Sequence, residues 1–550
     1  MRFIKYLFSL NIIFCLLYHK TIAQNSNEGQ IHGNFQLDIQ SYKKDSTIGA
    51  PEVPEKALMN SYANFIYTKG NFSAGARYES YLNTLQGFDK NYDGQGIPFR
   101  YASYTADELE VTVGNFYEQF GSGLVFRTYE DKGLGFDNAM DGIKLKYTFK
   151  GITLKGVTGK QRLFFDKGAG IVRGLDGEIA INQLINKYLE KKTQITIGGS
   201  YVSKYQADND PLYILPQNVD AYAGRLNINR GKINLYAEYA YKMNDPSADN
   251  NFIYKEGQAL LVNFTYSSKT FGVFLSGKRV DNMSFRSDRT ANINNLTINY
   301  LPVITKTHTY AMAAMYPYAT QLKGEMGGQI ELFYKFKKES FLGGKYGTNL
   351  TLNFSRINDI KKLSAKDTTA IEQSGYIGYK SNFFDIGNEI FYQDLNIEIS
   401  KKINKQFTII LLYQNLIYNY DIIRGMGGHG KVYADVGVAD ISYKISANHS
   451  VRLELQHLST EQDFKNWAMG LLEYSISPHL FFTVFDQYNY GNEDSDKRLH
   501  YFSFSVAYTK NANRISIGYG KQREGIMCVG GVCRNYPASN GIFASISSSF

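Results

Sequence analysis

The ten residues Gly541-Ile-Phe-Ala-Ser-Ile-Ser-Ser-Ser-Phe550 decide the fold class, because their side chains alternate in character with a period of two. Ile542, Ala544 and Ile546 fall on one side of an extended strand together with Phe550, while serines fall opposite them. In water the serine face would make a poor core. In a bilayer-spanning barrel, the apolar side meets lipid and the small polar side meets the lumen. The stretch therefore predicts a transmembrane β-strand.

The last residue of this stretch has a second implication. A terminal aromatic residue is the usual mark read by the machinery that folds outer-membrane barrels. Chance alone would place Phe at this position about one time in twenty. We therefore expect Phe550 to be the barrel-assembly signal, with outer-membrane lipid and the barrel-assembly machinery as partners.

The beginning of the chain predicts a secretory signal peptide over residues 1–23. A charged start is followed by an apolar run and by the small residue Ala23, which places the mature start at Gln24. Cys15 lies in the apolar run without a small residue before it, which disfavours a lipoprotein. No later run approaches the length of a transmembrane helix. A closed barrel is then the remaining way to cross the bilayer.

Composition favours one large domain over residues 24–550 rather than several globular ones. The 550 residues include 44 Tyr and 36 Phe but only 10 Pro, and no linker divides them. The expected fold is all-β: a single antiparallel up-and-down transmembrane β-barrel of about 22–26 strands. A strict count gives about 26, but the stretches 97–141 and 295–324 do not resolve into strands. A soluble propeller is disfavoured, because no blade-length repeat occurs.

Tight turns alternate with long polar loops along the chain, and this alternation predicts the topology. Tight turns are expected near Gly70, Gly151, Gly231 and Asn511, with the long loops between them. In outer-membrane barrels tight turns are periplasmic and long loops extracellular. We therefore expect an outer-membrane protein with both termini in the periplasm.

A dense polar segment begins at Gly114, where simple alternation breaks. Its charged residues, expected to form a polar cluster in the lumen, are Glu118, Arg127, Glu130, Asp131, Asp137 and Asp141. We expect Arg127 to pair with a carboxylate, because an unpaired charge in a constricted lumen is costly. The cluster is either a constriction or plug that selects solutes, or structural ion pairing inside the barrel wall.

Three motifs resemble a known family. They are GNFYEQFGSGLVFRTYE at 114–130, YPYATQ at 316–321 followed by Gly324-Glu325, and CVGGVCR at 528–534. Together they are similar to a Bacteroidota outer-membrane protein family of unknown function. The resemblance covers most of the mature chain and implies an outer-membrane barrel in a Bacteroidota host. It implies no activity.

Two cysteines remain after signal removal, and we expect them to form a disulfide in the last long loop. Gly530 and Gly531 between Cys528 and Cys533 permit the tight turn that the bond requires. A zinc site is disfavoured, because no His lies in that loop. We expect no metal and no other cofactor.

Enzymatic signatures are lacking, so the chain is not expected to be an enzyme. The segment 272–279 approaches a phosphate-binding loop but ends in Arg and lies in an alternating strand. No Gly-x-Ser-x-Gly or His-Glu-x-x-His motif occurs. The formal net charge of +9 is scattered along the chain, which predicts no nucleic-acid partner.

Two functions stay open. The first is a passive, porin-like channel for polar solutes, because a barrel of this strand number must hold water or a plug. The pairs Arg77 with Glu79 and Arg452 with Glu454 on the lumen face favour uncharged or zwitterionic solutes. The second is a non-transporting structural, assembly or secretion-associated barrel that docks partner proteins. A lumen filled with paired charges would favour the second function.

Overall fold

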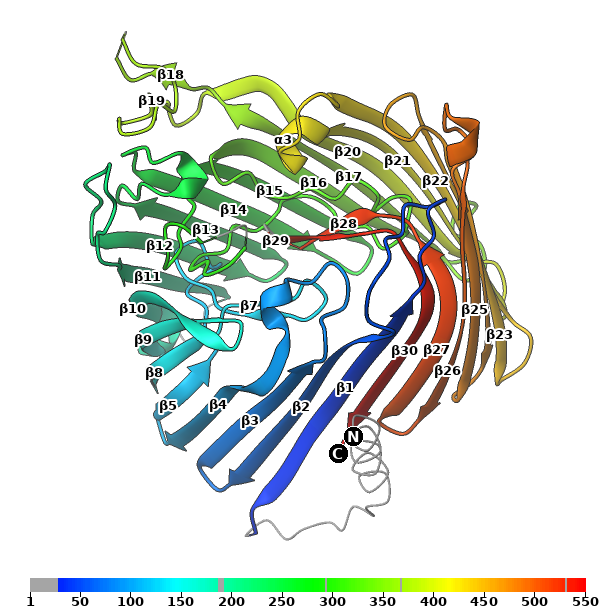
Figure 1. Ribbon diagram of the computed structural model, residues 1–550, viewed down its shortest axis with the longest axis horizontal. Helices are drawn as coiled ribbons and strands as arrows, with labels where there is room; N and C mark the ends of the chain where they lie inside the picture. Colours follow the sequence, from blue (N-terminus) through cyan, green and yellow to red (C-terminus); the bar gives the residue numbers. More distant parts are fainter. Residues whose placement is uncertain (1–27, 186–191, 292–293, 367, 530–531) are drawn as a thin grey trace.

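The computed structural model describes residues 28–185, 192–291, 294–366, 368–529 and 532–550. Its main element is one sheet of 24 antiparallel strands. β1 (Gln30–Tyr42) pairs with β2 (Leu58–Lys69) on one side and with β30 (Ser539–Ser549) on the other, so the sheet closes into a barrel (Figure 1). The predicted fold and the range of 22–26 strands are confirmed. The predicted signal peptide lies outside the described residues.

The wall strands follow one another around the barrel in chain order. Besides β1, β2 and β30 they are β3 (Phe72–Tyr81), β4 (Gly94–Ala106), β5 (Leu109–Phe116), β8 (Met140–Phe149), β9 (Ile152–Leu163), β10 (Asp166–Ala180), β11 (Thr193–Tyr205), β12 (Asn218–Arg230), β13 (Ile233–Lys242), β14 (Gly257–Ser267), β15 (Phe271–Asp281), β16 (Gly324–Phe336), β17 (Thr348–Ile360), β20 (Ile386–Lys402), β21 (Phe407–Asn419), β22 (Lys431–Lys444), β23 (His449–Thr460), β24 (Trp467–Ile476), β25 (Leu480–Tyr488), β26 (His500–Lys510) and β27 (Asn513–Gln522).

The remaining elements lie in the connections. Three short hairpins pair β6 (Glu130–Asp131) with β7 (Phe136–Asp137), β18 (Leu363–Ser364) with β19 (Tyr379–Lys380), and β28 (Gly525–Val529) with β29 (Val532–Tyr536). The short helices are α2 (Ile181–Leu184), α3 (Tyr420–Arg424), η1 (Lys90–Tyr92), η3 (Ala248–Asn250) and η4 (Ser495–Lys497). Within the described ranges, no helix is both long enough and apolar enough to cross a membrane.

The connections divide the barrel into a short-turn end and a long-loop end (Figure 1). At the short-turn end, Gly70, Gly151 and Asn511 adopt left-handed backbone angles with φ of 54°, 83° and 53°. Two-residue hairpin turns need such angles, because these turns match the twist of the flanking strands. The predicted tight turns are therefore confirmed. The start of β1 and the end of β30 lie at this same end (Figure 1).

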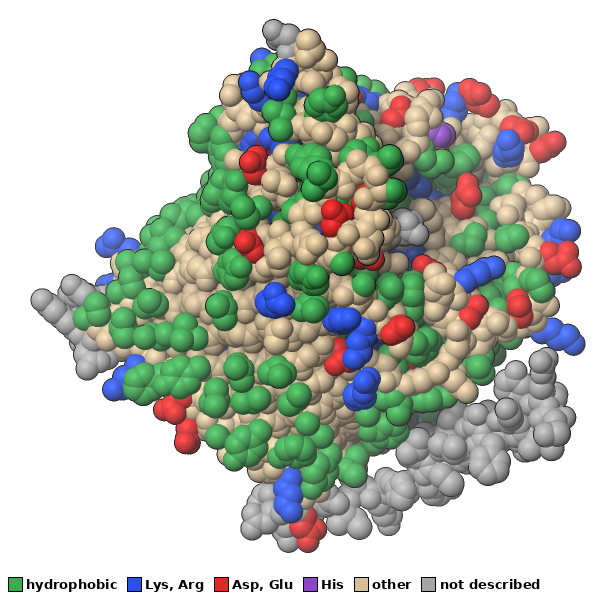
Figure 2. Space-filling view, turned by 60° about the vertical axis from the view of Figure 1, so that its left-hand side comes forward, with side chains coloured by type: hydrophobic (Ala, Val, Ile, Leu, Met, Phe, Trp, Pro, Cys, Tyr) green, Lys and Arg blue, Asp and Glu red, His purple; other side chains and the backbone are tan. Residues whose placement is uncertain are grey.

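The wall alternates in the manner that the sequence predicts. On β8, Ile143 and Leu145 are 45% and 46% exposed on the outer face. Lys144 between them points inward, and its Nζ lies 2.8 Å from Oε1 of Glu110. On the left of the view in Figure 2, hydrophobic side chains spread over the outer face with few charged ones among them. Such a surface matches the hydrocarbon of a bilayer.

The two stretches that resist assignment belong only partly to the wall. Residues 117–139, between β5 and β8, and the described residues 282–291 and 294–323, between β15 and β16, form no wall strands. We call them the inner segments. The backbone N–H of Arg127 donates to the carbonyl of Ile298 at 2.8 Å, so the two segments bond to each other. The strict count of about 26 strands was therefore too high.

The inner segments build a hydrophobic core inside the barrel. From the first segment, Phe120 and Phe126 are fully buried, and from the second, Phe285 and Ile298. The inward side chains that they cover come mainly from β9–β15 and β20–β24, and include Val157, Val172, Val202, Ala221, Ala240, Ala259, Leu412, Leu416, Val436 and Leu458. Burial of this apolar surface is the main force that holds the inner segments against the wall.

Candidate functional site

The lumen is divided into a filled side and a polar side. The filled side is the hydrophobic core described above. On the polar side, the inward faces of β1, β26 and β30 carry Gln36, Asp38, Ser503 and Ser545. These side chains follow the alternation expected of a water-facing lumen, which places Ile542 outside, where it is 53% exposed.

A cavity of about 1060 Å³ lies between this polar wall and the second inner segment. Gln36 and Ser545 line it from the wall, while Thr305 and Tyr316 line it from the inner segment. The carboxylate of Asp38 accepts a hydrogen bond from Nε2 of Gln36 at 2.9 Å. The cavity has the volume of a binding site for a small molecule. A second depression, of about 510 Å³, lies among mainly apolar side chains of β20–β23, including Ile399, Leu411 and Leu455.

Basic side chains outnumber acidic ones around the cavity. The basic residues are Lys132, Lys306, Lys521, Arg523 and Arg534, with His308 beside them, and the one described carboxylate in the lining is Asp38. Three of these groups have acidic partners outside the lining. Lys521 lies 2.7 Å from Asp45, His308 lies 2.7 Å from Asp394, and Lys306 lies 4.0 Å from Glu398.

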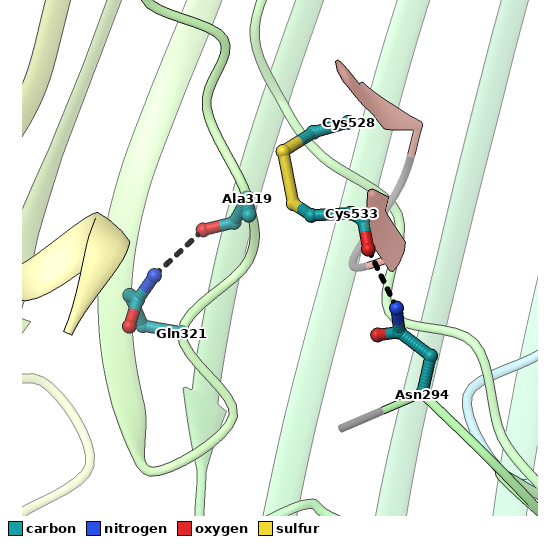
Figure 3. The surroundings of a disulfide bond; sticks show 5 residues. All are labelled: Asn294, Ala319, Gln321, Cys528 and Cys533. Carbon is teal, nitrogen blue, oxygen red and sulfur yellow. Dashed lines mark hydrogen bonds between the residues drawn. A yellow bond between two sulfur atoms is a disulfide. The ribbon is translucent and has the colours of Figure 1, made fainter. Parts of the chain in front are cut away.

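The disulfide hairpin β28–β29 covers part of the cavity. Cys528 and Cys533 are bonded, with their Cα atoms 4.1 Å apart, as the sequence predicts. The side chain of Asn294 in the second inner segment donates to the carbonyl of Cys533 at 2.7 Å (Figure 3). Val532 packs with Leu134 and Phe136 of the first inner segment. The hairpin thus folds inward and joins both inner segments, rather than standing free as an outer loop.

Two residues of the predicted polar cluster meet the wall in a buried ion-pair network. The guanidinium of Arg77 lies 2.8 Å from Glu130 and 2.6 Å from Asp137. Arg162, on β9, lies 2.6 Å from both Asp137 and Glu79. Burial raises the pKa of Glu130, and the charge of Arg77 partly offsets that rise. This network joins the first inner segment to β3 and β9.

The other predicted members lie apart from it. Glu118 pairs with Lys155 on β9 at 2.8 Å. Asp131 caps the turn of β6–β7 by accepting from the backbone N–H of Leu134 at 3.0 Å. Asp141 has the same strand parity as the outward Ile143, and it lies 2.6 Å from Lys167 near the long-loop end. Asp141 is therefore not a lumen residue, and the six charged residues form no single cluster.

The contacts of Arg127 also differ from the prediction, which was an ion pair with a carboxylate. Its guanidinium lies over the rings of Tyr129 and Tyr300, at 4.5 Å and 4.0 Å from the ring centroids. No carboxylate among the described residues forms an ion pair with it. The aromatic faces stabilise the cation in place of a carboxylate, because their quadrupoles present negative charge. Sequence reasoning also missed Arg162, whose partner Glu79 is 83 residues away in the chain.

Within the described parts of the chain, no three His, Cys, Asp or Glu side chains gather as metal ligands. No curated protein sequence matches the chain. The model of a family of unknown function (DUF6029) matches residues 3–550.

Three solved structures illustrate the likeness to known proteins. The translocation pore of the P pilus usher PapC is 9% identical, over 94% of this chain and 99% of that chain, with a TM-score of 0.44. The siderophore receptor PirA from Pseudomonas aeruginosa is 11% identical, over 95% and 80%, with a TM-score of 0.41. The outer membrane protein opdK from Pseudomonas aeruginosa is 11% identical, over 78% and 99%, with a TM-score of 0.35. At these identities the likeness concerns the barrel fold alone.

Proposed function

We propose that this chain, which belongs to the family of unknown function DUF6029, is an outer-membrane channel through which small polar solutes pass passively along one side of the lumen. The observation that carries the proposal is the cavity of about 1060 Å³ against the polar wall. A barrel of 24 strands is too wide to be filled by its own wall side chains. The inner segments fill much of the lumen, and the polar side is what remains for water and solute.

The proposal includes a placement in the outer membrane. The short-turn end, with both termini, would face the periplasm, and the long loops would face outward. Phe550 would be read by the barrel-assembly machinery. The Bacteroidota host rests on the sequence resemblance alone. The proposal also holds that the chain is not an enzyme, needs no cofactor and binds no nucleic acid.

The second candidate is a non-transporting barrel that docks partner proteins, and the filled side of the lumen favours it. Phe120, Phe126 and Phe285 are buried against the wall, so the inner segments would expose a large apolar surface if they left the barrel. A lumen with such a fixed filling has less room for solutes. The cavity against the polar wall is the feature that this alternative leaves without a role.

Solute uptake into proteoliposomes tests the choice between the two. Vesicles that contain the protein should swell in isosmotic small sugars and amino acids, but hardly in a bulky oligosaccharide. Ser545→Trp puts a large side chain into the cavity and should slow the swelling. The matched control, Ser548→Trp, lies on the outer face of the same strand and should leave the rate unchanged. Swelling that equals that of empty vesicles, with folded protein present, would contradict the channel.

A further inference from the structure

Three cations in the cavity lining have no acidic partner in the part of the chain that the structure describes. Lys132 comes from the first inner segment, Arg523 follows β27, and Arg534 lies on β29. Throughout the described residues, no carboxylate oxygen lies within the 4.0 Å ion-pair distance of these three groups. Asp131 acts on Arg534, and Glu130 on Lys132, only from beyond that distance. The lining therefore carries three cations that are in no close ion pair.

Aromatic rings hold these cations in place. Nζ of Lys132 lies 4.5 Å from the centroid of the Tyr62 ring. The guanidinium of Arg534 lies 4.1 Å from the centroid of the Phe88 ring. A ring covers one face of each cation and shields it from water, but it leaves the N–H groups free to donate to a ligand. Nε of Arg534 is buried and has no hydrogen-bond partner among the described residues.

The three cations surround the cavity from different elements. Lys132, Arg523 and Arg534 line the same cavity, and so does Tyr62, whose ring lies against Lys132. The guanidinium of Arg523 lies 5.7 Å from the ring centroid of Trp467. Burial lowers the pKa of Arg534, so its charge is held at a cost that an anion would relieve.

We infer that the cavity binds small organic anions, whose carboxylate or phosphate oxygens accept hydrogen bonds from Lys132, Arg523 and Arg534. Guanidinium groups donate to such oxygens in a bidentate manner, and an ammonium group adds a point charge. The tyrosines of the lining would contact the organic part of the ligand. The inference rests on the proposed function, since it names the class of solute that the channel selects. Organic anions differ from the uncharged or zwitterionic solutes that the sequence favours.

Binding to the purified protein in detergent tests the site without any need for transport. Citrate and glycerol phosphate should bind, measured by titration calorimetry, while glycerol should not. The variant Lys132→Gln with Arg534→Gln should weaken citrate binding on the order of tenfold or more. A matched control, Lys465→Gln, removes a cation that pairs with Glu493 at 2.8 Å outside the cavity, and it should change nothing. Equal binding of glycerol phosphate and glycerol would overturn the inference.

Reversal potentials in a salt gradient across a planar bilayer then separate this inference from the proposed function. The wild-type protein should conduct anions in preference to cations. Arg523→Gln, added to the two substitutions above, should shift the preference toward cations, because Asp38 remains. Anion binding without any conductance would keep the site and reject the channel. Conductance without anion binding or anion preference would keep the channel and reject the inference.

Discussion

Replacing both cysteines by serine, Cys528→Ser with Cys533→Ser, should loosen the hairpin β28–β29 without unfolding the barrel. The bond joins residues five apart in the sequence, which by the chain-entropy relation corresponds to about 2 kcal/mol. Since 1.4 kcal/mol is a factor of ten, local opening of the hairpin should become roughly 30-fold more frequent. The wall strands should keep their stability, because their ladders do not involve the hairpin.

Hydrogen exchange read by mass spectrometry measures this opening directly. Amides of residues 525–529 and 532–536 should exchange roughly 30-fold faster in the variant, while those of β26 and β27 should not change. Unchanged exchange in the hairpin would contradict this expectation and would mean that the packing of Val532 and the bond from Asn294 hold the hairpin by themselves. Faster exchange throughout the wall would show instead that the disulfide stabilises the whole barrel.

Three further predictions concern the buried network and the two ends of the chain. Arg162→Met should lower the free energy of unfolding by about 3 kcal/mol, because Glu79 and Asp137 then share Arg77 alone; an unchanged urea midpoint would contradict this. Phe550→Ser should reduce the amount of heat-modifiable barrel in the outer membrane without lowering synthesis, and equal amounts would reject the assembly signal. Intact-mass analysis of the membrane-inserted protein should place its first residue at Gln24, and retained residues before it would contradict the predicted cleavage.

The barrel could be predicted from the sequence because each wall strand carries its own signal. On β30, the apolar Ile542 faces outward and the polar Ser545 faces the lumen, so the sequence itself indicates the direction of each side chain. The tight turns at Gly70 and Gly151 are local too, since a left-handed residue is needed there. The disulfide was also predictable, because only five positions separate its cysteines.

The interior could not be predicted, because its contacts join residues far apart in the chain. Arg162 meets Glu79 across 83 positions, and nothing in either local sequence indicates the other. One local signal does indicate that the inner face is covered. In β22, Val432, Ala434 and Val436 are small, apolar and inward, whereas a water-filled lumen would need polar residues there. Apolar side chains on both faces of a wall strand indicate that something covers the inner face.

Arg127 and Asp141 show the limits of reasoning from charge alone. The charge of Arg127 predicts a carboxylate beside it, but the rings of Tyr129 and Tyr300 stabilise the cation instead. The polar segment before Asp141 predicts a lumen position for it, yet the parity of β8 places it outside beside Lys167. Strand parity, counted back from Ile143, was the better guide to its position.

Single-channel recording of the wild-type protein in a planar bilayer tests whether the inner segments fill one side of the 24-stranded barrel and leave a narrow passage along the polar wall. We expect stable open steps that are smaller than those of an open 16-stranded porin recorded in the same buffer, although this barrel has more strands. Open steps as large as those of an empty 24-stranded barrel would contradict the filled interior. A membrane that stays sealed with folded protein inserted would contradict the passage.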